Sequence, residues 1–445
     1  MALQERELLF EMFGRDEFFA IIVEIIAALL RCDAMVQYHG QAIPMEPSQE
    51  LNESADVEKK VHEAPHAEHV SKIQETRYNH QAKFKPQFSD RIRIVVVGTE
   101  TAVFDPHSPV RERILAYTEK FASTDIIVMC GGKFEKASPR KGVTLYPTNS
   151  RSRFRRVFDA VRIGKTLAPA DVVTVQDPFE TGLAGLLIAR HLGAKLHVQV
   201  HTDFLSPSYG RVSPLNIVRQ RIASYVIAHA DRIRVVSEDI KQAIEGRYRP
   251  RAPISVLPIF VDIEKFKSAS ALADLVQKFA GYKTRLLVVS RLEQEKNVAL
   301  AVTAFAKAAP KDACLIIVGD GRQHAALKRQ AQDLGVMARV FFEGRQDAAP
   351  YYALADLVLV PSVYEGYGLV IIEALAAGKP VLSTDVGIAR EAGAIVVTPE
   401  QFENALKGWF ESGPHTGALI KYPYESFEAY VKAYGEDVAA TFSEG

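Results

Sequence analysis

The sequence has little cysteine and no excess charge of either sign. Its three cysteines, Cys32, Cys130 and Cys314, lie far apart and form no CxxC pair. They therefore provide no disulfide framework, which favours a reducing cytoplasm. Lys and Arg total 54, as do Asp and Glu, so the formal net charge is +0. No overall field would hold nucleic acid or an anionic membrane, and any attraction to phosphate must be local.

A hydrophobic run long enough to cross a membrane is also lacking. The most apolar stretch, residues 18–30 (FFAIIVEIIAALL), is interrupted by Glu24, whereas a bilayer requires about 20 apolar residues. It also lacks the basic start and cleavage site of a signal peptide. We interpret it as a packed or interfacial helix, with a buried anchor as the alternative. We expect a cytoplasmic protein, and peripheral contact with the inner face of the membrane remains open.

Residues 1–90 differ in composition from the rest of the chain. The apolar stretch is followed by residues 41–90, a polar segment rich in Glu, Lys, His and Gln without sustained periodicity. Such a segment buries too little apolar surface to offset its ordering entropy. We predict a mostly non-globular N-terminal extension. Whether it is functional or reflects an upstream start codon stays open.

The length of 445 residues suits two domains. From Arg91 onward, short β-branched runs alternate with helical patterns of ten to fifteen residues, which is typical of βαβ units and a parallel sheet. The sequence predicts an α/β protein with two Rossmann-like, doubly wound domains that face a central cleft, at residues 91–265 and 266–423. The expected strands of the two halves are 91–98, 126–130, 171–175, 196–200 and 232–236, then 285–290, 314–318, 340–342, 357–360 and 381–384.

Two motifs match known patterns by chance. Residues 62–66 (HEAPH) match the HExxH zinc pattern, but Pro65 disrupts the continuous helix that this site requires. Gly319-Asp320-Gly321 follows a strand like the start of GxGxxG, yet His324 stands at the third position. We therefore interpret it as a tight strand-to-helix turn and not as a dehydrogenase fingerprint.

Residues 151–162 carry five arginines with apolar residues interleaved. The spacing is typical of a solvated helix face whose apolar side packs inward. The functional alternative is a patch that meets anionic lipid headgroups or a phosphorylated acceptor.

The most informative segment is residues 365–374 (EGYGLVIIEA), which follow the strand at 357–360. Ligands bind at the carboxyl ends of strands in such folds. Gly366 and Gly368 allow the backbone to approach a ligand closely, and the helix that begins there offers free N–H groups. These features predict a binding site for a diphosphate. Glu373, about one turn into the helix, can accept hydrogen bonds from ribose hydroxyls, and Glu365 can reach the sugar.

A second segment, residues 290–296 (SRLEQEK), opens at the same edge of the sheet. Arg291 offers a planar fork of donors and Lys296 a point charge, which together suit phosphate oxygens. Alone, this spacing would more often be a solvated loop.

These residues resemble those of the retaining glycosyltransferases of the GT-B fold, family four (glycosyl transferases group 1). Members carry an R-x4-K pair and an E-x7-E pair, which Arg291/Lys296 and Glu365/Glu373 match here. The resemblance extends from Arg91 to the C-terminus. It implies that the last helix, 424–441, returns to the N-terminal domain.

The resemblance also implies roles for single residues. Arg291 and Lys296 would neutralise the leaving diphosphate, Glu373 would hold the ribose, and Glu365 would hold hydroxyls of the donor sugar. His201, after the strand at 196–200, would face that sugar, although a satisfied structural His-x-Asp pair is the alternative. The remaining donor-binding positions are phosphate-cradling amides and a base-lining segment: Gly366, Tyr367, Gly368 and Leu369, then Gly344 and Arg345.

One departure from the family concerns the acceptor side. Members usually have a glycine-rich loop after the first strand, whereas residues 98–105 read GTETAVFD. Acceptor chemistry is therefore the least transferable part of the resemblance.

The expected function is transfer of a hexose, with retention, from a UDP- or GDP-sugar to a glycan or lipid-linked acceptor, in polysaccharide or glycolipid biosynthesis. No metal cluster or DxD motif accompanies the phosphate segments, so we expect no metal cofactor, and the leaving charge would fall to preorganised cations and amides. The alternatives are a phosphorylase or sugar-nucleotide epimerase of the same fold, or a non-catalytic protein that binds sugar nucleotides.

Overall fold

The computed structural model describes residues 91–153 and 155–443. The expected N-terminal extension, its apolar stretch and the HEAPH motif lie outside the described residues. Among the helices that are described, none is both long and apolar enough to cross a membrane.

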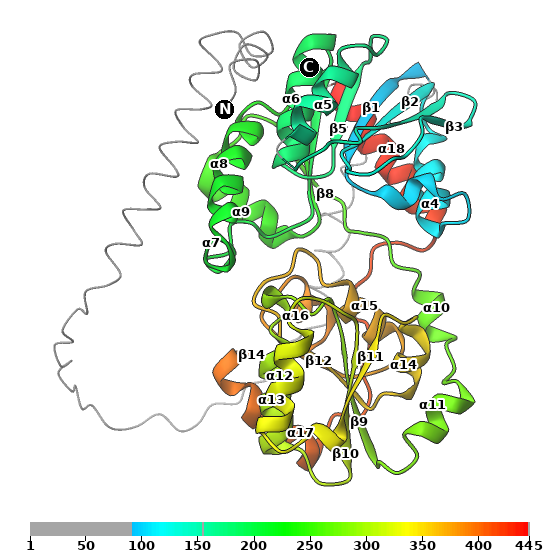
Figure 1. The fold of residues 1–445 in the computed structure, drawn as a ribbon. Helices are drawn as coiled ribbons and strands as arrows, with labels where there is room; N and C mark the ends of the chain where they lie inside the picture. The colour runs from blue at the N-terminus through cyan, green and yellow to red at the C-terminus, as the bar shows by residue number, and fades with distance from the viewer. Residues whose placement is uncertain (1–90, 154, 444–445) are drawn as a thin grey trace, which may run out of the picture. The chain divides into compact units, whose positions relative to one another are not determined.

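The N-terminal half, which we call the N-lobe, is built on one eight-stranded sheet (Figure 1). Its strand order is β3-β4-β2-β1-β5-β6-β7-β8, and every neighbouring pair is parallel except β3 and β4. Apolar runs such as RIVVVG in β1 form its buried centre. The strands are β1 (Arg93–Gly98), β2 (Ser123–Val128), β3 (Ala137–Arg140), β4 (Val143–Pro147), β5 (Val172–Val175), β6 (Lys195–Val200), β7 (Arg232–Val235) and β8 (Ile254–Val256).

Local capping explains where several N-lobe helices begin. The Ser108 side chain accepts a hydrogen bond from the Val110 amide at the start of α4, and Ser237 caps α9 in the same way. Gly193 ends α6 in the left-handed region, at φ 66°. The helices are η2 (Thr101–Phe104), α4 (Pro109–Thr118), α5 (Arg155–Gly164), α6 (Glu180–Leu192), α7 (Tyr209–Val212), α8 (Pro214–Ala228) and α9 (Glu238–Tyr248).

The C-terminal half, the C-lobe, contains a parallel six-stranded sheet of order β11-β10-β9-β12-β13-β14. Its apolar strands pack against α12 and α17 in one core. The strands are β9 (Thr284–Val289), β10 (Ala313–Val318), β11 (Val340–Gly344), β12 (Leu357–Val360), β13 (Val381–Thr384) and β14 (Ile395–Val397). Its helices include α12 (Val298–Ala308), α13 (His324–Asp333), α14 (Ala349–Leu354), α15 (Leu369–Ala376) and α17 (Phe402–Ser412).

The helix α18 (Phe427–Ser443) packs against β5, β6 and α4 of the N-lobe (Figure 1). It carries Asp437, whose carboxylate lies 3.0 Å from His197 Nε2 and 2.8 Å from Arg232 Nε. Ser255 Oγ donates a third hydrogen bond. Burial alone would raise the pKa of Asp437, but the hydrogen bond and charge of His197, with Arg232 and Ser255, hold it well below the usual range.

The predicted fold class, two parallel α/β domains, is confirmed. The sequence analysis missed four strands of three to five residues, β3, β4, β8 and β14, because such segments are too short to show periodicity. It also missed α17, although Phe402, Leu406 and Trp409 are buried at helical spacing. Further helices not expected are α10 (Ile263–Lys267), α11 (Ala273–Lys278) and α16 (Ala389–Ala392).

Candidate functional site

A cavity of about 280 Å³ lies at the carboxyl ends of β9 and β12, and we call it the C-lobe cavity. All but three of the predicted site residues line this cavity. The predicted residues that line it are His201, Arg291, Lys296, Glu365, Gly366, Tyr367, Gly368 and Leu369. Those that do not are Gly344, Arg345 and Glu373.

Helix α15 begins beside this cavity. Gly368 is its N-cap residue, at φ 91°, and no side chain of the described residues caps the helix. Because the first N–H groups of a helix have no partner within it, they can bind an anion. The left-handed φ of Gly368 is a conformation that favours glycine over any residue with a Cβ atom.

The structure gives Gly366 a packing role in addition to its place in the lining of the C-lobe cavity. A Cβ atom at this position would lie 1.7 Å from the carbonyl oxygen of His201, in the N-lobe. Ser237 Oγ also donates a hydrogen bond to the Gly366 carbonyl, at 3.5 Å. Gly366 therefore allows close approach between the backbones of the two lobes, and its approach to a ligand stays a prediction.

Lys296 and Glu365 form an ion pair inside the C-lobe cavity. Lys296 Nζ lies 2.6 Å from Glu365 Oε1, and both side chains are 16% exposed. Ser362 Oγ donates a second hydrogen bond to the same oxygen, at 2.8 Å. The sequence predicts that Lys296 binds the diphosphate of the donor and Glu365 its sugar. In the structure these two side chains contact each other directly.

Arg291 lies nearer to solvent, with its side chain 68% exposed. Its Nη2 atom lies 3.0 Å from Oε1 of Glu295, which is 14% exposed. Glu295 was not predicted, because the i,i+4 pairing rule applies along a helix and residues 291–293 lie in a loop before the 3-10 helix Gln294–Lys296.

Ser290, at the end of β9, contributes an unused polar group to the C-lobe cavity. Its Oγ atom is buried and has no hydrogen-bond partner among the described residues. Buried hydroxyls without partners are rare, and one that lines a cavity is available to a ligand. The sequence pattern alone predicts no role for Ser290.

The turn at Gly319–Gly321 packs against the loop that carries Ser290 and Arg291. Gly319 has φ 139°, and a Cβ atom there would lie 1.8 Å from the Ser290 carbonyl oxygen. A Cβ atom at Gly321 would lie 2.5 Å from the Leu292 carbonyl oxygen. These glycines are thus explained by backbone packing, as the tight-turn interpretation expects.

Glu373 lies on the second turn of α15 and faces a different space. Its Oε2 atom accepts a hydrogen bond of 2.8 Å from the hydroxyl of buried Tyr352. Burial raises the pKa of the Glu373 carboxyl. Tyr352 was not predicted, because the local sequence pattern does not indicate that the Tyr352 hydroxyl on α14 contacts Glu373 on α15.

Gly344 and Arg345, at the end of β11, line neither this cavity nor a larger one of about 590 Å³. Gly344 has φ 69°, and its carbonyl accepts a hydrogen bond of 2.7 Å from the Gly319 amide. The preceding Glu343 pairs with Lys278 at 2.7 Å. The role of these two residues at a nucleotide base stays a prediction.

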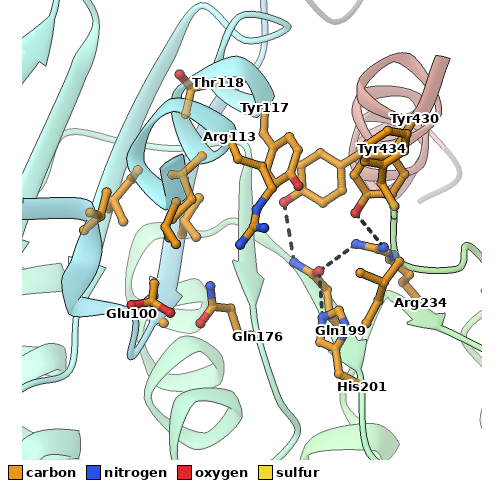
Figure 2. A pocket seen from close by; sticks show the side chains of 18 of the residues that line it. Glu100, Arg113, Tyr117, Thr118, Gln176, Gln199, His201, Arg234, Tyr430 and Tyr434 are labelled. Atoms are coloured by element: carbon orange, nitrogen blue, oxygen red, sulfur yellow. Dashed lines mark hydrogen bonds between the residues drawn. The ribbon is translucent and has the colours of Figure 1, made fainter. Parts of the chain in front are cut away.

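A second cavity, of about 590 Å³, extends into the N-lobe, and we call it the N-lobe cavity (Figure 2). Its lining includes Glu373 and Asp177. It shares three lining residues with the C-lobe cavity, namely His201, Ile259 and Leu369. The C-lobe cavity and the N-lobe cavity are therefore adjacent, and these three residues border both.

His201 stands between the cavities, and its proton is placed by a chain of hydrogen bonds (Figure 2). Arg234 Nη1 donates to Gln199 Oε1 at 2.8 Å, and His201 Nε2 lies 3.2 Å from the same oxygen. Because a guanidinium only donates, the Gln199 atom that faces it must be the oxygen, so Nε2 of His201 carries a proton. Burial, together with the charge of Arg234 and the neighbouring His197, lowers the pKa of His201 to about 3. His201 is therefore neutral, with Nδ1 as an acceptor.

Asp177, just after β5, is a buried carboxyl that also lines the N-lobe cavity. Burial raises its pKa to about 6, although its carboxylate accepts a hydrogen bond of 2.7 Å from the Phe179 amide. In the described ranges, no group of three or more His, Cys, Asp or Glu side chains could hold a metal ion. The expected independence from metal stays a prediction.

Two family models match the chain over most of its described length. Residues 122–265 match Glycosyltransferase Family 4, and residues 283–411 match Glycosyl transferases group 1. The chain is 28% identical over 249 residues to the alpha-monoglucosyldiacylglycerol synthase of Streptococcus pneumoniae, which covers 52% of this chain and 56% of that protein. It is 30% identical over 221 residues to an Escherichia coli UDP-Gal:alpha-D-GlcNAc-diphosphoundecaprenol alpha-1,3-galactosyltransferase, over 46% of this chain and 56% of that protein. The chain spans about half the length of the curated relatives it matches.

Solved structures share the fold at low sequence identity. The Anabaena protein HepE, in complex with UDP and glucose, aligns with a TM-score of 0.58 and 20% identity over 80% of this chain and 98% of that one. The sucrose-phosphate synthase of Thermosynechococcus elongatus aligns with a TM-score of 0.59 and 18% identity over 80% of this chain and 94% of that one.

Proposed function

We propose a function from one premise: the chain belongs to the family-four glycosyltransferases (glycosyl transferases group 1) of the GT-B fold. The proposed reaction transfers a hexose, with retention of configuration, from a nucleoside-diphosphate sugar to a glycan or lipid-linked acceptor. Relatives whose names include a diacylglycerol product or an undecaprenol acceptor support a lipid-linked acceptor. Work at the cytoplasmic face of a membrane would follow from such an acceptor and is part of the proposal.

The observation that carries the proposal is the convergence of phosphate-binding groups on the C-lobe cavity. The Lys296 ammonium, the Arg291 guanidinium and the start of α15 all border the same 280 Å³. Ser290 adds a buried hydroxyl without a partner in the described part of the chain. Cations and amide donors held around one space suit a diphosphate.

These groups would also stabilise the transition state. As the bond from the anomeric carbon to phosphate breaks, negative charge develops on the diphosphate, and fixed donors in a partly buried site stabilise that charge. We propose that the departing phosphate oxygen accepts the acceptor's proton on the same face of the sugar. Glu365 is less suited to act as a covalent nucleophile, because Lys296 and Ser362 already bind its carboxylate.

Neutral His201 would act on the sugar as a hydrogen-bond partner. Its Nε2 proton is engaged by Gln199, so Nδ1 is the ring nitrogen left to accept a bond from a sugar hydroxyl. A group with a pKa of about 3 would not serve as a general acid near neutral pH.

The test is a panel of UDP- and GDP-sugars with purified full-length protein, with release of nucleoside diphosphate as the signal. We expect release with one or a few donors, and Lys296→Ala to reduce it about 100-fold or more, the scale for loss of one transition-state donor. Lys307→Ala is the matched control, because Lys307 forms a surface ion pair with Glu403 at 2.9 Å, outside both cavities. Equal rates in the two variants would contradict the site.

Retention is tested separately by the anomeric configuration of the first product, read from its proton coupling. Product with the same configuration as the donor supports the same-face route. An inverted product would rule this route out and leave the family membership untouched.

A further inference from the structure

We infer that a third cavity, between α8 and α9 of the N-lobe, binds the phosphate group of a small organic phosphate. This α8–α9 cavity has a volume of about 450 Å³. Among the described residues that line it, none also lines the C-lobe cavity or the N-lobe cavity. Its ligand therefore occupies a site separate from both, and the inference goes beyond the proposed function without depending on it.

Two arginines from neighbouring helices line the α8–α9 cavity. Arg221 lies within α8 and Arg247 in the last turn of α9, and these two helices contact each other (Figure 1). Neither arginine forms an ion pair with another described residue, and no acidic residue of the described chain lines the cavity. Two like charges that border one space repel each other, and a bound anion would relieve that repulsion.

Two hydroxyl groups accompany the arginines. Ser224 on α8 and Tyr248 at the end of α9 line the same cavity, and neither hydroxyl has a hydrogen-bond partner within residues 91–153 and 155–443. Burial raises the pKa of Tyr248, whereas the charges of Arg247 and Arg221 act to lower it, so both guanidiniums lie near its hydroxyl. Protonated hydroxyls and guanidiniums around one space match the acceptor oxygens of a phosphate.

The remaining lining suits the organic part of such a ligand. Leu205 and Ile217 contribute apolar surface, and the Tyr248 ring stacks on Phe204 with 6.3 Å between their centroids. Because Phe204 is buried in the lobe, this contact holds the Tyr248 ring in place. The cavity volume lies within the usual range of small-molecule sites. The lining therefore favours a phosphate carried on an alkyl or aryl group over inorganic phosphate alone.

The experiment measures binding of phenyl phosphate to the full chain by calorimetry. Lys296→Ala removes a cation of the C-lobe cavity, so binding that persists in this variant belongs to another site. We expect such binding, and we expect inorganic phosphate to bind more weakly. Affinity should increase as pH rises through about 6, where a phosphate monoester takes its second negative charge, and should decrease with added salt.

Charge-removing variants locate the site. Arg221→Gln and Arg247→Gln should each weaken phenyl phosphate binding about tenfold or more, the loss expected for one charge-assisted hydrogen bond. Arg251→Gln is the matched control, because Arg251 is exposed and does not line the cavity. It removes the same charge and should change the affinity less than about twofold. Urea unfolding checks that all three variants fold.

Vesicles distinguish a lipid phosphate from a soluble one. We would add vesicles of phosphatidylcholine, with and without phosphatidic acid, to the complex with phenyl phosphate. Displacement only by the vesicles that contain phosphatidic acid would assign the site to a lipid headgroup. Retention of phenyl phosphate with both kinds of vesicle would assign it to a soluble ester.

Three results would overturn the inference: no heat of binding at millimolar phenyl phosphate, binding that Lys296→Ala abolishes, or equal weakening by Arg221→Gln and Arg251→Gln. None of them concerns turnover of a sugar nucleotide, so the proposed function would stand. Conversely, a chain that turns over no UDP- or GDP-sugar could still bind phenyl phosphate at this site, and that binding would support the inference alone.

Discussion

Arg234 Nη1 donates a hydrogen bond of 2.8 Å to Gln199 Oε1, and this contact fixes the tautomer of His201. The guanidinium lies in a fully buried position of β7, so the orientation of the Gln199 amide is set from inside the lobe. His201 therefore presents a proton-free Nδ1 without any change of charge in the working pH range.

Gln199→Glu should change that state of His201. A carboxylate at this position would favour the imidazolium, so the pKa of His201 should rise from about 3 toward neutrality. We expect the pH profile of kcat/KM to gain an ionisation that the wild type lacks. Nitrogen NMR of the imidazole would report the tautomer and pKa directly.

Gln199→Leu provides the matched control for that experiment. It removes the hydrogen bond without adding charge, so His201 should stay neutral and no ionisation should appear in the profile. An unchanged profile in Gln199→Glu would contradict the proposed coupling.

Ser290→Ala should have opposite effects on stability and on donor binding. The Ser290 hydroxyl is buried and unpartnered in the described structure, so its removal should raise the free energy of unfolding by up to about 1 kcal/mol. If the hydroxyl binds the donor, the KM for the sugar nucleotide should rise about fivefold, as for loss of about 1 kcal/mol. Urea unfolding and donor titrations give the two numbers. Lower stability with an unchanged KM would show that Ser290 serves the fold and not the donor.

Gly366→Ala should separate activity from folding. Its Cβ atom would lie 1.7 Å from the His201 carbonyl oxygen, so the backbones of the two lobes would have to move apart. We expect activity to fall by 100-fold or more, on the scale of an ångström-level misplacement of reacting groups, while each lobe stays folded.

Gly408→Ala is the control for that substitution, since no atom of the described part of the chain lies within 4 Å of the added methyl group on α17. It should leave activity unchanged and stabilise the helix modestly. Near-wild-type activity of Gly366→Ala would mean that the lobes need not approach so closely during turnover.

Asp437→Ala should be severely destabilising. Asp437 is buried and bound by His197, Arg232 and Ser255, and removing one partner of a buried charged pair costs about 3–5 kcal/mol. Asp385→Ala, which breaks the exposed pair with Arg390, should change stability by less than about 0.5 kcal/mol. Urea unfolding would measure both. A loss below about 1 kcal/mol for Asp437→Ala would contradict a structural role for this network.

The sequence predicted the parts of the site that are contiguous in the chain. The roles of residues 290–296 and 365–374 can be predicted from the local sequence, because the end of a strand, a turn and the start of a helix determine where their side chains and amides lie. Gln199, Arg234 and Tyr352 could not be selected in this way. Their importance comes from partners on other elements, such as the bond of Tyr352 to Glu373, which only the packing of the lobes creates.

The same limit explains the two glycines. At Gly368 the positive φ at a helix start follows from the local pattern, whereas at Gly366 the reason is a backbone carbonyl more than 160 residues away, at His201. The strands β8 and β14 have three residues each. They are too short to show the alternation of apolar and polar residues that indicates a strand.

Asp177 should make stability depend on pH in the opposite direction to Asp437. Its pKa is about 6 when folded and near 3.9 when unfolded, so the folded state binds its proton more tightly. Stability should therefore fall as pH rises from about 4 to 6, by up to ~3 kcal/mol at ~1.4 kcal/mol per pKa unit. Asp437 has a lowered pKa, so its contribution is present above about 4 and is lost as pH falls further. Urea unfolding should show a smaller decline between pH 4 and 6 in Asp177→Asn than in wild type, while Glu373, whose pKa burial also raises, keeps its own share. The same slope in both proteins would show that Asp177 is not the group that titrates.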